Sequence, residues 1–453
     1  MNAPPRLLDR TYRPFAVGIV AVITLAAFEG VGTATAMPVI AADLGALGSY
    51  TWAFTGYVVA SLLAMVVAGL HCDARGPRWS ITAGIAAFAI GSLVAGFAWN
   101  LGVLLLGRAI QGAGSGAVIV GVYVLIARAL PIELRPKAFS LLSAAWVTPA
   151  LVGPLIAGWL ADTISWRWVF WIIPLFVIAP SVLLLPRLRS QDGGSPVADR
   201  RPRIRAGVLT CLGLVLVQDG VLRLNPIGTA EAGCGLILII ASCRPLFPPG
   251  TLRLARGLGC TVAMRGILAS AFFCAELFVP LALVREAGAS TTVAGLALSL
   301  AAVGWVLGSS IQSRVPQERD RATIVRIGCC IVGLSILATS LVLLPGVPIW
   351  ATVITWAIGA VGMGLTFPSI SVQALRLSRE ADQGRTSSSL QIADSLLVVA
   401  VASLVGSIHA LAVRSGTDGP ATYLILWCAA ASIAFAGAVA AARMTPVTAA
   451  DPG

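Results

Sequence analysis

Fourteen apolar segments, each long enough to cross a lipid bilayer as a helix, follow one another along this chain of 453 residues. A spanning helix needs about 20 mostly apolar residues. The two shortest segments, 206–222 and 227–243, could instead form a peripheral or re-entrant hairpin. The fourteen segments are 15–40, 51–70, 80–98, 103–127, 138–161, 168–185, 206–222, 227–243, 263–284, 292–311, 324–344, 348–372, 386–411 and 421–442.

The composition leaves lipid as the solvent for most of the chain. Hydrophobic residues make up 58% of the sequence and charged residues 11%, where about 25% charged residues is usual for soluble domains. So little polar material cannot cover a water-soluble core of this size. This excludes a soluble enzyme, a nucleic-acid-binding protein and a disordered protein, and it predicts an all-α integral membrane protein.

The basic residues predict the orientation of the chain in the membrane. The net charge is +12. If the N-terminus is cytoplasmic, 26 of the 31 basic residues fall on the cytoplasmic side, where Arg265 and Arg326 are counted with the loops before their segments. Arg108 is then the only basic residue assigned to a span. The segments on the other side hold Arg167, Arg223, Arg285 and Arg414. Basic residues stay in the cytoplasm, so both termini are expected there. This bias does not distinguish fourteen spans from twelve, since removing a hairpin keeps the parity.

A flexible linker divides the spans into groups. Residues 187–205, RLRSQDGGSPVADRRPRIR, are rich in Gly, Pro, Ser and charge, which is typical of a loop. We expect an N-terminal six-helix bundle at 1–186, this cytoplasmic linker, an extra transmembrane hairpin at 206–243 and a C-terminal six-helix bundle at 244–453. Two six-helix halves of this kind place a transport site between them at the middle of the membrane.

Ionisable residues within the spans are the candidates for function, because charge in lipid is costly. Glu29 lies near the middle of its span, and Glu276 lies at a similar depth in the ninth. Asp394 has Gln391 one turn away on the same face, and Arg108 could offset a carboxylate. For each, the alternative is a structural hydrogen bond or ion pair. Asp219 and His409 lie near span ends, and His409 is expected at the membrane interface.

Four motifs give the first half a family resemblance. The loop after the second span has an acidic and basic pattern around a glycine, the fourth span has Arg108 and small residues, and the fifth has a Gly-Pro pair. The residues are Asp73, Gly76 and Arg78; Arg108, Gln111, Gly112 and Gly114; Gly153, Pro154, Ala157 and Gly158; and Glu29 with Pro38. Together they resemble the major facilitator superfamily, specifically its fourteen-span drug:proton antiporters. Ala74, Pro77 and Pro149 depart from the family pattern.

Each motif also has a physical interpretation. Asp73 and Arg78 can tie cytoplasmic helix ends together around Gly76 in one conformational state and release them in another. Gly153-Pro154 removes a backbone hydrogen bond, so the fifth span is expected to bend there. Small residues such as Gly112 and Gly116 allow close helix packing. Ordinary helix packing alone is the alternative for the last two motifs.

The resemblance implies a proton-coupled exporter of lipophilic, often cationic small molecules that works by alternating access. Its partners are then substrate, protons and the bilayer, and it acts as a monomer in a bacterial cytoplasmic membrane. The nine cysteines show no metal-ligand spacing, so neither metal nor cofactor is expected. The alternatives are a dedicated exporter of an envelope lipid, siderophore or other metabolite, a membrane-embedded enzyme, and a receptor or scaffold with a degenerate transporter fold.

Overall fold

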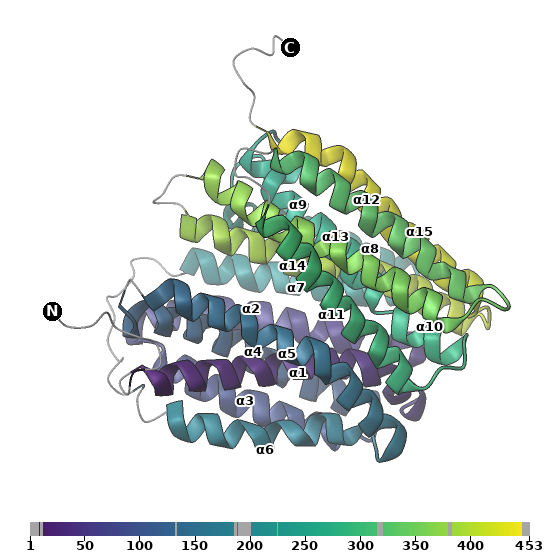
Figure 1. Cartoon of the computed structure of the whole chain (residues 1–453), viewed down its shortest axis with the longest axis horizontal. Coiled ribbons are helices and arrows are strands. Elements are labelled where there is room, and N and C mark those ends of the chain that lie inside the picture. Colours follow the sequence, from purple (N-terminus) through teal and green to yellow (C-terminus); the bar gives the residue numbers. More distant parts are fainter. Residues whose placement is uncertain are drawn as a thin grey trace, which may run out of the picture. The chain divides into compact units, whose positions relative to one another are not determined.

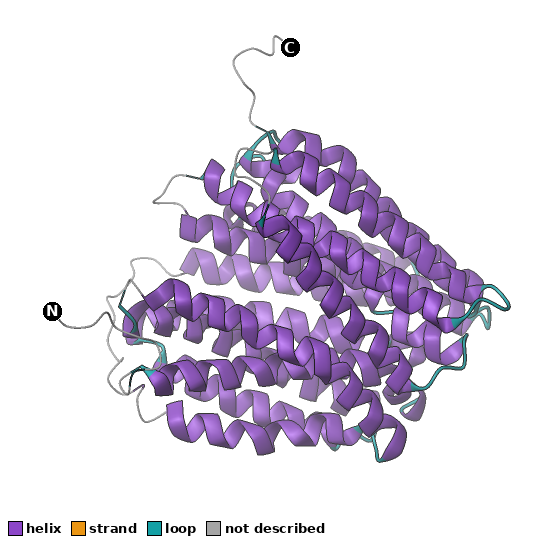
Figure 2. Cartoon of the chain, viewed as in Figure 1, coloured by secondary structure: helices purple, strands orange, loops and turns teal. Residues whose placement is uncertain are grey.

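The computed structural model describes residues 9, 12–131, 134–184, 188, 201–223, 225–314, 320–378 and 383–445. Most of the predicted linker at 187–205 therefore lies outside the described residues. The described part contains helices and no strand (Figure 2). Figure 1 labels the α-helices. Their bounds are α1 Arg13–Asp43, α2 Trp52–Arg75, α3 Arg78–Gly96, α4 Leu101–Ala129, α5 Arg135–Thr163, α6 Arg167–Leu184, α7 Arg201–Arg223, α8 Pro226–Cys243, α9 Leu258–Glu276, α10 Val279–Arg285, α11 Thr291–Ser313, α12 Arg321–Thr339, α13 Ile349–Leu377, α14 Gln383–Arg414 and α15 Pro420–Ala440.

Short polar side chains begin several of these helices. Asn100 accepts a hydrogen bond from the backbone of Val103 at the start of α4, and Ser290 caps α11 in the same way. Asp320 accepts from the first backbone N–H groups of α12. These caps satisfy donors that have no partner inside the helix. At the other end of a helix, Gly76 has a φ of 88° directly after α2, a conformation that favours glycine.

Twelve helices in the described part are long and apolar enough to cross a membrane. They include both segments of the uncertain hairpin, as Ile204–Arg223 and Pro226–Leu246. The other two of the fourteen predicted segments, 138–161 and 168–185, are not among these twelve. They fall on α5 and α6, and some of the side chains of these helices are not described. Large apolar side chains face outward on many helices, as at Ile237 (69% exposed) and Val439 (78% exposed), which fits a lipid environment.

The ninth span is longer than predicted and interrupted. It runs from Leu258 to Arg285 as α9 and α10. Pro280 has no N–H to donate to the carbonyl of Glu276 four residues earlier, so the α-helix stops there and restarts. Because this span begins at Leu258, Arg265 lies well within it. Arg265 was therefore wrongly counted with the preceding loop, and Arg108 is not the only basic residue within a span.

The chain divides into two compact units. Unit 1 comprises Met1–Ala46 and Trp52–Cys211, and unit 2 comprises Leu47–Thr51 and Leu212–Gly453. In unit 1, α1 packs on α5 and α6, α4 packs on α2 and α3, and α3 packs on α6. In unit 2, α9 packs on α14 and α15, α13 packs on α11 and α12, and α12 packs on α15. The six-helix packing pattern is thus repeated.

Candidate functional site

The interior of unit 1 holds an ion pair between Glu29 of α1 and Arg108 of α4. Their side chains are 0% and 3% exposed. Arg108 Nη1 donates to Oε1 of Glu29, and the same oxygen accepts a hydrogen bond from the hydroxyl of Thr33 at 2.8 Å. The other carboxylate oxygen, Oε2, is buried and has no hydrogen-bond partner among the described residues. A proton can therefore add to Oε2 without displacing an existing bond.

The Arg108 side chain is fixed on several sides. Its Nε donates to the backbone carbonyl of Ala53 at 3.0 Å, and its guanidinium lies 4.3 Å from the centre of the Tyr57 ring. Nη1 also donates to Oε1 of Gln111 at 2.9 Å, and Gln111 in turn donates to the Ser92 hydroxyl at 2.7 Å. The network joins α1, α2, α3 and α4. A buried charge held by so many partners has a defined position.

Close helix packing brings α4 onto α2. A Cβ atom at Gly112 would overlap the carbonyl oxygen of Tyr57, and one at Gly116 would overlap the carbonyl oxygen of Ser61. The small residues predicted to allow close approach therefore do so at this contact. The same contact holds the Tyr57 ring beside Arg108.

Unit 2 contains a second ion pair, between Arg265 of α9 and Asp394 of α14. Arg265 Nε lies 2.8 Å from Oδ2 and 3.0 Å from Oδ1 of Asp394. Arg265 Nη1 donates to the Ser371 hydroxyl and to the carbonyl of Phe367, and its guanidinium lies 3.7 Å from the centre of the Phe367 ring. Sequence reasoning missed this partner of Asp394, because it assigned Arg265 to a loop.

Glu276 and Gln391 do not join these networks. Glu276 is half-buried at the break between α9 and α10, and Gln391 is exposed on α14. Neither forms a hydrogen bond or ion pair with the residues that the structure describes. The structure therefore does not bring Gln391 to Asp394.

Aromatic rings pack together near the start of the second six-helix repeat. Phe272 stacks on Trp356 with ring centres 4.5 Å apart, and Phe273 stacks on Trp305. Trp305 also meets Phe367, the ring beneath Arg265, at 5.1 Å. Glu276 lies one turn after Phe272 and Phe273 on α9. These rings therefore form one packed cluster in unit 2.

The motif residues of unit 1 have the following positions. Asp73 lies in the last turn of α2, and its side chain is outside the described set. Gly76 is buried in the turn, and Arg78 begins α3. Gly153 and Pro154 lie inside α5, which continues as a helix through both. A Cβ at Gly153 would come within 2.9 Å of the Val31 side chain on α1.

His409 lies beneath the turn that follows α14. It was expected at the membrane interface because it lies near the end of α14. The structure buries it to 1% exposure, since the turn after α14 folds back and carries Asp418 to within 3.6 Å of its Nε2. Proximity to a helix end does not show what the next loop covers.

A family model described as the Major Facilitator Superfamily matches residues 17–403. The chain belongs to this superfamily. With twelve apolar helices in the part of the chain that the structure describes, it is a multi-pass membrane protein. The family and the relatives below indicate a transporter rather than an enzyme.

Several curated members of the superfamily resemble the chain over part of its length. It is 32% identical to the multidrug transporter protein MdtP of Bacillus subtilis over 36% of this chain and 30% of the relative. It is 34% identical to multidrug resistance protein 3 of the same organism, over 34% and 30%. It is also 34% identical to the acurin A biosynthesis cluster MFS-type transporter of Aspergillus aculeatus, over 47% and 39%. The matched stretches thus span less than half of each relative.

Solved transporter structures share the fold of this superfamily member. A POT family transporter crystallised in complex with 5-aminolevulinic acid superposes with a TM-score of 0.70, covering 95% of this chain and 96% of that one. The sequences are 14% identical. The similarity therefore shows a shared fold over nearly the whole chain.

Proposed function

We propose that this transporter exports lipophilic, often cationic small molecules in exchange for protons, by alternating access. The observation that carries the proposal is the buried carboxyl of Glu29. Its Oε1 accepts a hydrogen bond from Arg108, and its Oε2 has no hydrogen-bond partner among the described residues. A buried charge within a membrane is costly and is a functional candidate by default. Two multidrug transporters among the relatives support the choice of cargo.

The proposed cycle uses the two states of Glu29. The deprotonated carboxylate attracts a cationic substrate from the cytoplasmic side, and protonation at Oε2 removes that attraction on the outer side. Arg108 keeps the carboxyl in place in both states through Oε1. A membrane potential of 100 mV supplies about 2.3 kcal/mol per unit charge, enough for roughly a 50-fold gradient.

We further propose fourteen spans with both termini in the cytoplasm of a bacterium, and a monomeric transporter. The halves are 1–186 and 244–453, joined by the linker 187–205 and the hairpin 206–243. Two features support this arrangement: the distribution of the basic residues and the repeated six-helix packing. Reporter fusions after residues 48, 200, 225 and 445 test it, since the first and third are expected outside and the other two inside. The fusion after residue 225 is outside only if the hairpin crosses the membrane, so it distinguishes fourteen spans from twelve.

Proton-driven transport in proteoliposomes tests the function. We expect Glu29→Gln to bind Arg108 and Thr33 still, because its amide oxygen accepts hydrogen bonds, but to lose substrate efflux driven by a pH gradient. Asp219→Asn is the matched control, because it neutralises an exposed carboxylate on α7 that pairs with Arg223. Wild-type efflux by a folded Glu29→Gln protein would refute the proposal.

A dedicated metabolite exporter is the second candidate. The acurin A cluster relative matches the longest stretch of the three relatives described above, at 217 residues. A panel of dyes and drugs at several external pH values separates the two functions. Transport of many unrelated compounds favours multidrug export, whereas loss of one envelope component on gene deletion favours a dedicated cargo.

A further inference from the structure

His409 occupies an enclosed position in unit 2 and is 1% exposed. Three aromatic rings surround its imidazole, with centroids 5.4 Å away for Phe278 and 6.3 Å away for Tyr50 and Tyr423. They come from the residues after α9, the segment that joins α1 to α2, and α15. Such an apolar enclosure favours the neutral imidazole.

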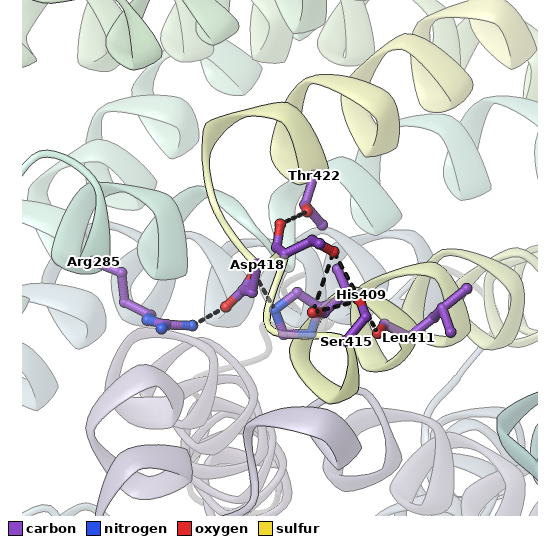
Figure 3. Close-up of polar contacts among 8 residues, drawn as sticks. Arg285, His409, Leu411, Ser415, Asp418 and Thr422 are labelled. Atoms are coloured by element: carbon purple, nitrogen blue, oxygen red, sulfur yellow. Dashed lines mark hydrogen bonds and ion pairs between the residues drawn. The ribbon is translucent and has the colours of Figure 1, made fainter.

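Asp418 faces this ring from the turn between α14 and α15 (Figure 3). Its Oδ2 binds Nη1 of Arg285, and its Oδ1 lies 3.6 Å from Nε2 of His409. Both Oδ1 and Nε2 are buried, and neither has a hydrogen-bond partner among the described residues. A proton on Nε2 of His409 would allow it to donate to Oδ1 of Asp418, and both buried atoms would then have a hydrogen-bond partner.

Two further charged groups near His409 and Asp418 affect whether His409 is protonated. Arg285 lies at the end of α10, and Glu286 follows it. Burial raises the pKa of Glu286, the Asp418 carboxylate raises it further, and Arg285 lowers it. When Glu286 is ionised and His409 is neutral, Arg285 faces two carboxylates. One proton on His409 then balances the charge of the group.

We propose that Nε2 of His409 and Oδ1 of Asp418 form a proton-binding site in unit 2. The neutral ring carries its proton on Nδ1 and presents a lone pair at Nε2. A proton from solvent adds to that lone pair, and the new N–H donates to Oδ1. The imidazolium and the carboxylate form an ion pair, while Oδ2 keeps its bond to Arg285. The proton comes from a hydronium ion, whose O–H bond breaks as the N–H bond forms, and a water molecule is released.

The site has a consequence for the segment Leu47–Thr51. This segment connects α1 and α2 of unit 1 but belongs to unit 2. Tyr50 holds it there, because its hydroxyl donates to the carbonyl of Leu277 at 2.8 Å and its ring packs beside His409 and Phe278. A charge on His409 acts directly on the ring that anchors the connection between the first two spans.

Imidazole NMR of the purified full chain tests the site without requiring transport. The chain has two histidines, so a His71→Gln variant with labelled histidine reports His409 alone. We expect its signals to titrate between pH 4 and 9. If the His409 signals did not change with pH over this range, the proposal would be overturned. This measurement leaves every residue of the site unmutated.

Two variants in the same background identify the partners. Asp418→Asn should move the midpoint of the His409 titration to lower pH by about one to three units, because the carboxylate that favours the imidazolium is gone. Arg285→Gln should move it to higher pH, because a competing positive charge is gone. An unchanged midpoint in both variants would overturn the assignment. Glu29→Gln leaves this titration unchanged, so the site and the proposed function fail separately.

Discussion

Arg265 on α9 binds both carboxylate oxygens of Asp394 on α14, although the two residues lie 129 positions apart in the chain. In unit 2, α9 packs on α14 as α1 packs on α5 in unit 1. The first helix of the second repeat forms its ion pair through the base Arg265, whereas the first helix of the first repeat forms its ion pair through the acid Glu29. The two bundles repeat the packing of their helices but not their ion pairs.

Variants that break the ion pair between Arg265 and Asp394 should show how much it contributes to the free energy of unfolding. We expect Asp394→Asn to lower the free energy of unfolding by about 1–3 kcal/mol, because Arg265 loses a charged partner while it stays largely buried. The double variant Arg265→Gln with Asp394→Asn should lose less than the sum of the two single variants, since no unpaired charge remains. Unfolding in detergent by increasing SDS measures all four proteins. Strictly additive losses would contradict a direct interaction.

Arg108 should not tolerate replacement by lysine. Lysine keeps the charge but has no Nε–H for the Ala53 carbonyl and no planar group to stack on Tyr57. We expect Arg108→Lys to lower the free energy of unfolding by about 1.5–3 kcal/mol. Arg326→Lys, at an exposed position on α12, is the matched control and should leave stability unchanged. Equal stability of the two variants would show that charge alone matters at Arg108.

The contact between α2 and α4 predicts a contrast between two glycines. A Cβ at Gly116 would overlap the backbone of α2, whereas one at Gly30 would have no atom within 4 Å among the described residues. Gly116→Ala should therefore cost about 1–3 kcal/mol through overpacking. Gly30→Ala should stabilise α1 by about 0.5–1 kcal/mol. Thermal unfolding of both variants checks the sign of each effect, and loss of stability at Gly30 would contradict the packing described for α1.

Twelve of the fourteen predicted segments correspond to candidate spans in the described part of the chain, because length and apolar composition are local properties. Even the uncertain segments 206–222 and 227–243 correspond to candidate spans. The ninth span was predicted to start at 263, only two residues before Arg265, so Arg265 was counted with the loop; the helix begins at Leu258. A charged residue near a segment end is assigned to a loop when its partner is not known. The partner of Arg265, Asp394, lies on a different helix, so no local sequence pattern predicts this ion pair.

The candidate site shows the same limit. The cost of charge in lipid singled out Glu29, Arg108 and Asp394 as residues of interest. It did not indicate which acid meets which base, because that depends on how distant helices pack. Thr33 could have been found, since it lies one helical turn after Glu29 and can reach it. His409 could not, because a turn that follows its helix buries it.

Glu286 gives a prediction about pH. Its folded-state pKa is raised, first by burial and then by the Asp418 carboxylate. The folded protein therefore binds the Glu286 proton more tightly than the unfolded chain does. The stability linked to this proton is present below the pKa of an unfolded glutamate, about 4.3. It is lost as the pH rises through the folded-state pKa.

Replacing Glu286 by glutamine removes this dependence. The midpoint of thermal unfolding of Glu286→Gln should equal that of the wild type near pH 4 and exceed it at pH 7, where the wild type carries the unfavourable charge. The gain at pH 7 should be smaller in an Asp418→Asn background, because one of the two causes is already absent. A variant less stable than the wild type at pH 7 would instead show that the attraction of Arg285 outweighs burial and Asp418 together.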